Sequence, residues 1–296
     1  MRNEPYRTAT NRIESDRTVK DERVIMPVAS PYVRIPDEDA WRGDGPLLPE
    51  GVCRVADGAL GATRLLGGDF ARNDEGKVLV AAFDFDGTCI QGNSPVMLVR
   101  SLARRRMLAP SVIARILGWG IAYKTRLPQN EAWVRGLVFR AFAGRPANEV
   151  NQFLYDFYDR AIDARFRPDA EAEMAAHEAA GHAVVCVSAT FEPIVAAAMQ
   201  RHPIQYAIAT RMKVDFQGTY TDEVEGEPIE GAEKVTVLNR LCDELFGAGQ
   251  WELAWAYGDH HSDRAMLAAA RNAFAVTPDR PLTRTANAEG YDILEW

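Results

Sequence analysis

Four uninterrupted runs of apolar residues stand out in the second part of the chain. Apolar side chains at consecutive positions predict strands that are buried on both faces, as in a parallel sheet. Helical patterns separate these runs, and strands that alternate with helices indicate βαβ crossovers and an α/β fold. The predicted strands cover 78–83, 183–187, 253–257 and 273–276. The predicted helices between and after them cover 193–200, 232–246 and 262–270.

The segment between the first two strands has helical patterns only, with Gly and Pro between them. We therefore predict a helical cap domain at 95–167, inserted into a core domain formed by 77–94 and 168–296. Further on, residues 212–224 alternate in polarity around Gln217-Gly218, which predicts a β-hairpin. The helices of the cap are expected at 95–107, 111–123, 130–142 and 147–164.

The N-terminal part of the chain shows no sustained period. Residues 1–50 are polar, with mixed charge and several prolines, and residues 51–76 contain many glycines. We predict a mostly disordered or loosely packed extension over 1–76. A short apolar stretch at 59–66 predicts a small helix within it.

Composition excludes several classes of protein. The net charge of -8 argues against a dedicated nucleic-acid binder. The four cysteines form no CxxC pair, which argues against a zinc or disulfide framework and fits a reducing cytoplasm. The first 25 residues carry charges throughout, so no secretory signal is expected, and no apolar run is long enough to predict a membrane-spanning helix.

Polar residues follow three of the predicted strands. Asp84 comes directly after the first strand, Ser188 after the second, and Gly258-Asp259 after the third. Ligands of open α/β sheets bind outside the carboxyl ends of the strands. We therefore expect these polar side chains to converge on one crevice.

The first of these segments reads Asp84-Phe85-Asp86-Gly87-Thr88. Asp84 and Asp86 point the same way if the extended conformation continues, and two adjacent carboxylates need a cation or a shared proton. Mg²⁺ binds carboxylate and phosphate oxygens and would shield an anionic phosphate from an anionic nucleophile. Gly87 lets the backbone turn and places amides near the phosphate. The alternatives are a surface turn and a calcium loop.

The next two segments are ambiguous by themselves. The hydroxyl of Ser188, in Ser188-Ala189-Thr190, can bond a phosphoryl oxygen, or it can simply cap the helix that follows. Lys234, at the start of a helix, can neutralise a nucleophile and a phosphoryl group, or it can be a solvated surface lysine.

The last segment reads Gly258-Asp259-His260-His261-Ser262-Asp263. Its two aspartates, four residues apart around a strand-to-helix turn, suit a metal ion held directly or through water. The two histidines raise the alternative of a transition metal. Such a site usually needs further histidines, and only His177, His182 and His202 remain.

The order of these motifs is more specific than any one of them. DxDGT, then Ser, Lys and GDxxxD, resembles the haloacid dehalogenase superfamily of phosphohydrolases from about residue 77 to the end. The helical insertion resembles the phosphoserine-phosphatase-like branch (subfamily IB type). The resemblance implies a Rossmann-like doubly wound parallel sheet with an inserted α-helical bundle cap.

The resemblance also implies a Mg²⁺-dependent phosphatase and a role for each matching residue. Asp84 attacks phosphorus to form an aspartyl-phosphate, and Asp86 is the general acid and base. Mg²⁺ is bound by the Asp84 carboxylate, the Asp86 carbonyl and Asp259, with Asp263 as an outer partner that orients the site. The implied phosphate-binding residues are Gly87, Thr88, Ser188, Ala189 and Lys234.

Two cap-side residues bear on the substrate. Phosphoserine phosphatases carry a glutamate nine residues after the nucleophile, and this chain has Asn93 there. Arg140 matches the position of a substrate-binding arginine in that branch. We therefore expect a small phosphate ester other than phosphoserine as the substrate.

Three alternatives remain open. A phosphotransferase would pass the phosphoryl group to an alcohol in place of water. A lipid-phosphate phosphatase would use the apolar stretch at 112–123 for peripheral contact with a membrane. A non-catalytic phosphate-binding regulatory module is a different class, and the intact Asp84 and Asp86 argue against it. The sequence does not indicate the oligomeric state.

Overall fold

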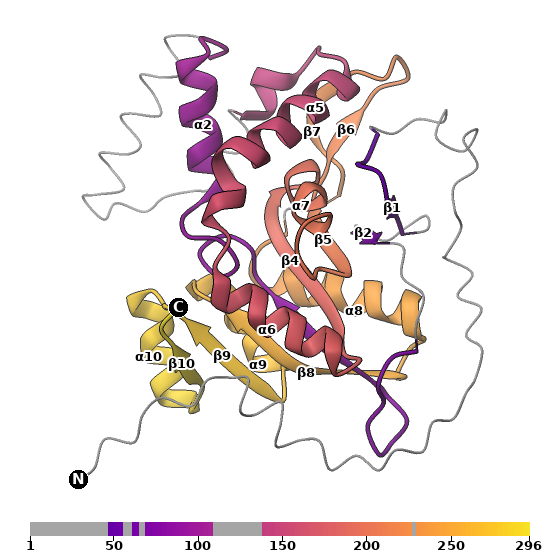
Figure 1. Cartoon of the computed structure of the whole chain (residues 1–296), viewed down its shortest axis with the longest axis vertical. Coiled ribbons are helices and arrows are strands. Elements are labelled where there is room, and N and C mark those ends of the chain that lie inside the picture. Colours follow the sequence, from indigo (N-terminus) through magenta and orange to yellow (C-terminus); the bar gives the residue numbers. More distant parts are fainter. Residues whose placement is uncertain (1–46, 56–60, 65–68, 109–137, 227–228) are drawn as a thin grey trace.

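An eight-stranded sheet forms the centre of the molecule (Figure 1). The computed structural model describes residues 47–55, 61–64, 69–108, 138–226 and 229–296. Strands lie in the order β1-β2-β5-β4-β3-β8-β9-β10. The six parallel strands are β3 (Val78–Phe83), β4 (Ala183–Phe191), β5 (Tyr206–Thr210), β8 (Trp251–Gly258), β9 (Asn272–Val276) and β10 (Asp292–Leu294).

The order of the parallel strands confirms the predicted fold. Counted along the chain, β3, β4, β5, β8, β9 and β10 lie in the spatial order 3-2-1-4-5-6, which is the doubly wound Rossmann order. The first strand, β3, lies between β4 and β8, so the direction of winding reverses beside it. The carboxyl end of β3 is therefore the expected place for a ligand.

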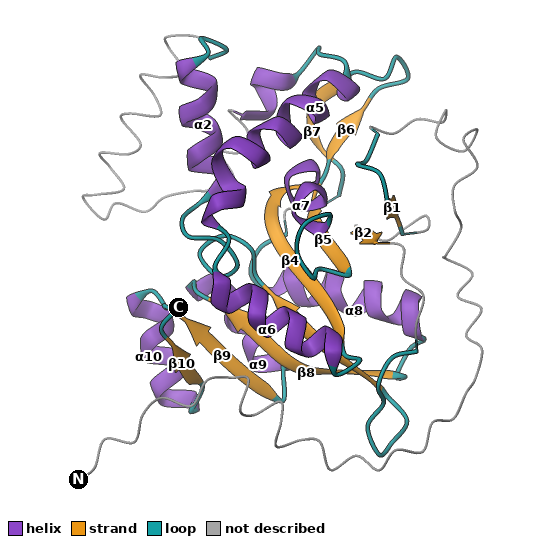
Figure 2. Cartoon of the chain, viewed as in Figure 1, coloured by secondary structure: helices purple, strands orange, loops and turns teal. Residues whose placement is uncertain are grey.

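Helices cover both faces of the sheet (Figure 2). Leu79, Ala81 and Phe83 of β3 share one apolar core with helices α6 and α7, while the alternate residues of β3 pack with helices α8, α9 and α10. Burial on both faces explains why the strand reads as a continuous apolar run. The helices are α6 (Pro168–Ala179), α7 (Glu192–Met199), α8 (Ala232–Phe246), α9 (Arg264–Ala269) and α10 (Arg280–Glu289).

Several elements were not predicted from the sequence. The strands β5 and β10 have five and three residues, too few for a clear pattern. Helix α10 is mostly polar and buries only Leu282 and Ala286. Contacts with neighbouring strands and helices fix the positions of these three elements. Their own sequences show too little periodicity to predict them.

Part of the predicted cap lies at one end of the sheet (Figure 1). Helix α2 (Ser94–Arg104) and helix α5 (Ala147–Phe157) confirm two of its helices, and α5 continues through a π-helical turn, Tyr158–Ile162. Residues 138–142 are helical, while 111–123 and the rest of 130–142 lie outside the described residues. The cap boundaries at 95 and 167 stay a prediction.

The predicted hairpin is confirmed as β6 (Met212–Val214) and β7 (Tyr220–Val224), which pair antiparallel. Backbone hydrogen bonds join it to the segment before α5. Gly144 N donates to Tyr220 O at 2.8 Å, and Ala147 N donates to Gly218 O at 2.9 Å. The hairpin follows β5 in the chain. These hydrogen bonds attach it to the segment that leads into α5.

Two short segments of the predicted loose extension are instead built into the sheet. Strands β1 (Val52–Arg54) and β2 (Gly61–Arg64) extend the sheet, and β2 pairs with β5. The helix predicted at 59–66 is instead a strand from residue 61 to 64, because its backbone pairs with β5. The pairing is so close at Gly61 that a Cβ there would lie 2.7 Å from Ala207 O. The remaining part of the predicted extension lies outside the described residues.

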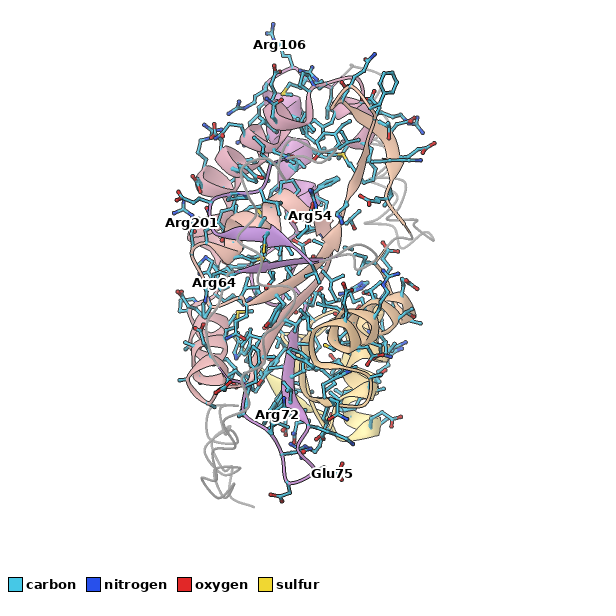
Figure 3. All side chains as sticks on the ribbon, turned by 90° about the vertical axis from the view of Figure 1, so that its right-hand side faces the viewer. Arg54, Arg64, Arg72, Glu75, Arg106 and Arg201 are labelled. Atoms are coloured by element: carbon cyan, nitrogen blue, oxygen red, sulfur yellow. The ribbon has the colours of Figure 1, made fainter. Side chains whose placement is uncertain are left out.

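Ion pairs also join these two strands to helices of the core, through Arg54 and Arg64 (labelled in Figure 3). Arg54 donates from Nε and Nη2 to the two oxygens of Glu192, at 3.3 and 2.9 Å. The Glu192 side chain is only 5% exposed. Arg64 bonds the Glu178 carboxylate of α6 at 2.9 Å. Two strands outside the resemblance are thus built into the fold.

Replacing Arg54 by methionine should destabilise the protein by about 2 kcal/mol, because Glu192 would lose its bidentate partner while remaining buried. The free energy of unfolding in urea measures the effect. Lys213→Met is the matched control, since it removes the exposed Lys213–Glu223 pair and should cost under about 1 kcal/mol. Equal losses in the two variants would contradict the structural role of Arg54.

Candidate active site

Asp84 lies at the carboxyl end of β3, where the fold places a ligand. Its backbone N–H donates to Tyr257 O of β8 at 2.9 Å, which anchors the residue between the central strands. The residue is only 6% exposed. Burial raises the pKa of its carboxyl group well above the usual value, and the nearby Lys234 opposes that shift.

Lys234 joins two of the predicted site residues. It is the third residue of α8, is 3% exposed, and donates from Nζ to Asp84 Oδ1 at 2.5 Å and to Asp263 Oδ1 at 2.6 Å. Burial alone would lower the pKa of Lys234, but the carboxylates of Asp263 and Asp84 outweigh it and raise the pKa. The alternative of a solvated surface lysine is therefore wrong.

Asp259 completes a group of three carboxylates. One ligand atom from each of Asp84, Asp259 and Asp263 lies within 4.8 Å of the others. Burial, and then the charge of Asp263, raise the pKa of Asp259 to about 7. Three carboxylates share a single lysine, so the group has an excess of negative charge that a divalent cation would neutralise. The donor set, all carboxylate oxygens, is the kind that Mg²⁺ prefers.

Two glycines make this close approach possible. Gly87 has φ of +83°, and a Cβ there would overlap the carboxylate of Asp259. A Cβ on Gly258 would lie 2.6 Å from Asp263 Cβ. Both glycines are therefore required by the packing of the carboxylates.

The Gly87 amide is used within its own loop. It donates to Ile90 O at 3.1 Å and to Gly92 O at 3.0 Å, which departs from the expected contact with phosphate. The buried Thr88 directs its hydroxyl to Asp259 Oδ1 at 3.4 Å. In this structure Gly87 shapes its own loop and Thr88 contacts the carboxylate group through Asp259.

Asp86 is held by a residue that sequence reasoning missed. Ser94, the first residue of α2, donates its backbone N–H to Asp86 Oδ1 at 2.5 Å and its hydroxyl to Oδ2 at 3.0 Å. Ser94 Oγ also contacts Thr190 Oγ1 at 2.6 Å, from the end of β4. The sequence placed Ser94 directly before a predicted helix, and nothing in that local pattern pointed to Asp86.

Ser188 lies within β4, which continues to Phe191. The pairing of β4 with β5 is irregular between Val187 and Phe191, so the backbone around Ser188 departs from a regular ladder. Ser188 Oγ accepts from Thr190 N at 3.0 Å, which leaves its O–H free to donate, and Ala189 O accepts from Thr210 Oγ1 at 2.7 Å. The helix-capping alternative is wrong, because the N-cap of α7 is Phe191.

The two tentative substrate residues are both exposed. Asn93 is the N-cap of α2, and its Oδ1 accepts from Val96 N at 3.1 Å. Arg140 lies in the helical segment 138–142 and makes no hydrogen bond or ion pair with the residues that the structure describes. No described contact joins either residue to the carboxylate group, so their roles in substrate binding stay predictions.

The histidines do not gather into one metal site. His177 and His182 bond each other through their Nδ1 atoms at 2.9 Å, and His177 Nε2 contacts the Tyr257 hydroxyl at 3.0 Å. His202 stacks on Phe166. His260 and His261 are left beside the carboxylates without a third histidine.

The fold and the site together place a lysine-bonded group of aspartates at the switch point of a doubly wound sheet. The family model described as "haloacid dehalogenase-like hydrolase" matches residues 81–268. The chain therefore belongs to the haloacid dehalogenase-like hydrolase family. The predicted class, a phosphatase of this type, is confirmed.

Named relatives agree with this class. A probable phosphatase from Mycobacterium tuberculosis is 28% identical over 222 residues, covering 73% of this chain and 75% of the relative. A phosphoserine phosphatase from the same organism is 25% identical over 219 residues, covering 73% and 70%. A solved structure of a Bordetella pertussis protein of unknown function shares the fold, with a TM-score of 0.66 and 23% identity, over 74% of this chain and 99% of that one.

Proposed function

We propose that the protein is a Mg²⁺-dependent phosphomonoester hydrolase that forms an aspartyl-phosphate on Asp84. The observation that carries the proposal is the buried Lys234, which bonds Asp84 and Asp263 beside Asp259 at the carboxyl end of β3. With a divalent cation bound to the carboxylates, the buried lysine would let the site balance the charge of a phosphoryl group.

The carboxylates of Asp84 and Asp259 and the backbone carbonyl of Asp86 would hold Mg²⁺, and Asp263 would orient the group while bonding Lys234. When bound, the ion neutralises charge on the phosphoryl oxygens. Thr88, whose hydroxyl points to Asp259, would help to orient that ligand.

The covalent steps belong to the two aspartates. Lys234 occupies Oδ1 of Asp84, so Oδ2 can attack phosphorus as the bond to the leaving oxygen breaks. Asp86 gives its proton to the leaving oxygen. It then takes a proton from the water that attacks the aspartyl-phosphate, releasing inorganic phosphate and restoring Asp84. Ser94 orients Asp86 for both transfers.

Phosphoryl oxygens would be bound by Lys234, the Ser188 hydroxyl and the backbone of Ala189. Gly87 would contribute through the loop shape that it permits, since its amide is already bonded. Positioning and neutralisation of charge would provide most of the catalysis.

The substrate would be a small phosphate ester. The alternative of a lipid phosphate depends on residues 112–123, which lie outside the described residues. In the part of the chain that the structure describes, no helix is long and apolar enough to cross a membrane. All four cysteines are buried and free, which supports a reducing, cytoplasmic location.

Chelation should remove turnover, and added Mg²⁺ should restore it. Asp259→Ala removes a proposed ligand, so it should raise the Mg²⁺ concentration for half-maximal rate by about tenfold or more. The control is Glu289→Ala, which removes an exposed carboxylate at the far end of α10. Full activity of the metal-stripped wild-type protein would contradict this assignment.

Phosphoserine should not be the preferred substrate. Its ammonium group needs a countercharge, and Asn93 offers an amide whose oxygen already caps α2. The test compares kcat/KM for phosphoserine, sugar phosphates, glycerol phosphates and lysophosphatidate, with and without an alcohol acceptor. A lead of tenfold or more for phosphoserine, or about 1.4 kcal/mol, would contradict this interpretation of Asn93. Transfer to the alcohol in preference to water would favour the phosphotransferase.

A further inference from the structure

A second group of potential metal ligands lies beside the active-site loop. It consists of His260, His261 and Asp279, whose ligand atoms all lie within 4.8 Å of one another. The histidines follow β8, and Asp279 lies between β9 and α10. The two loops are joined by a backbone hydrogen bond from Asp279 N to Asp259 O at 2.8 Å. Tertiary structure thus adds a carboxylate to the histidine pair.

Other contacts orient two of the three side chains, those of Asp279 and His260. One oxygen of Asp279, Oδ1, accepts from Leu282 N at 2.7 Å and caps α10, so the other oxygen faces the histidines. His260 Nδ1 contacts Ser262 Oγ at 3.0 Å, which directs Nε2 toward Asp279. Ligands of metal ions are typically held by such outer partners.

The spacing of the donor atoms suits a tetrahedral ion. Asp279 Oδ2 lies 3.0 Å from His261 Nδ1 and 3.6 Å from His260 Nε2. Bonds of about 2.0–2.1 Å in a tetrahedral zinc site put ligand atoms about 3.3 Å apart. An ordinary ion pair needs one imidazole, whereas here two ring nitrogens approach the same carboxylate oxygen.

We propose that His260, His261 and Asp279 form a binding site for a divalent transition-metal ion of the Zn²⁺ type. Imidazole nitrogens favour Zn²⁺ or Cu²⁺ over Mg²⁺, which selects oxygen ligands. The His261 side chain is 50% exposed, so water can fill the remaining positions of the ion. The ion would be separate from the proposed Mg²⁺ site, because the two groups share no residue.

Occupancy of this site would stabilise the loop that carries the catalytic carboxylates. His260 N donates to Asp263 Oδ2 at 3.1 Å, and Asp279 N bonds the carbonyl of Asp259. An ion that joins His260 and His261 to Asp279 would therefore hold the 259–263 loop against the loop before α10. The role is structural, and no reaction step passes through this ion.

The test is a Zn²⁺ titration of the full-length protein in excess Mg²⁺, followed by competition with a chromophoric chelator. One Zn²⁺ per chain is expected. His261→Gln and Asp279→Asn should each weaken Zn²⁺ binding by at least about tenfold. Asparagine caps helices as well as aspartate does, so Asp279→Asn should keep the start of α10 intact. Glu289→Gln, an exposed carboxylate at the other end of α10, is the matched control and should leave the affinity unchanged.

Two further measurements separate this site from the carboxylate group. In the Asp84→Asn variant, Zn²⁺ affinity should be unchanged. Cu²⁺ bound to the wild-type protein should show electron paramagnetic resonance couplings from two imidazole nitrogens, and from one in His261→Gln. Unchanged Zn²⁺ affinity in both His261→Gln and Asp279→Asn, absence of bound Zn²⁺, or Cu²⁺ spectra without imidazole coupling would each overturn the proposal.

Discussion

Asp84→Asn is expected to lower kcat by at least about a thousandfold, because an amide is a poor nucleophile toward phosphorus. The fold should be retained. The amide oxygen of asparagine can still accept from Lys234 Nζ, and Lys234 keeps its bond to Asp263. Steady-state kinetics with a phosphate ester that the wild-type protein hydrolyses measures the loss, and thermal unfolding checks the fold.

Asp86→Asn is the matched comparison for this prediction. It removes the acid and base but leaves the nucleophile, so the loss should be about 10²–10⁴-fold with an alkyl phosphate. With a p-nitrophenyl ester the first step should be less affected, since that leaving group needs no proton. Asp84→Asn should be inactive toward both esters. Activity near that of the wild type in Asp84→Asn would refute the aspartyl-phosphate mechanism.

Lys234→Met should have the largest effect on stability, a loss of about 3–5 kcal/mol. Lys234 is the buried cation between Asp84 and Asp263, and its removal leaves two buried carboxylates that repel each other. The free energy of unfolding in urea, measured without added Mg²⁺, reports the loss. Turnover should also disappear, since a neutral side chain cannot balance the phosphoryl group.

The double variant Lys234→Met/Asp263→Asn tests whether repulsion is the cause. Removing one of the two carboxylate charges should recover part of the lost stability, although Asp263→Asn alone should destabilise the protein by breaking its bond to Lys234. Such a non-additive result is the signature of a direct interaction. If the losses of the two single variants simply add, the buried charge group does not stabilise the fold in the way that its geometry indicates.

The core strands and the polar residues at their carboxyl ends were predictable because both signals are local. A strand buried on two faces must be apolar at every position, so β3 was recognised with its observed bounds and Asp84 was placed at its end. The order of the motifs along the chain then indicated the family. The assignment of Lys234 to the site rested wholly on this order, because a lysine at the start of a helix usually lies in solvent.

Residues that act through distant partners could not be recognised in this way. Ser94 begins a helix like many serines, and only the fold brings its hydroxyl to Asp86 and Thr190. Arg54 belongs to a segment without a pattern, yet it bonds Glu192, which is 138 positions away. Asp279 precedes a helix that was not predicted, and only the tertiary structure brings its carboxylate to two histidines.

The sequence by itself determined the α/β fold class, the central strands, the hairpin and the carboxylate–lysine motifs of this protein. The fold class, the strands and the hairpin follow from short-range patterns of apolar and polar residues, and the motifs from their order along the chain. The tertiary structure decided that β1 and β2 join the sheet, that Lys234 bonds both Asp84 and Asp263, and that Gly87 makes room for Asp259. The physical reason is that burial, charge pairing and close packing arise between residues far apart in the chain, and local periodicity carries no record of such contacts.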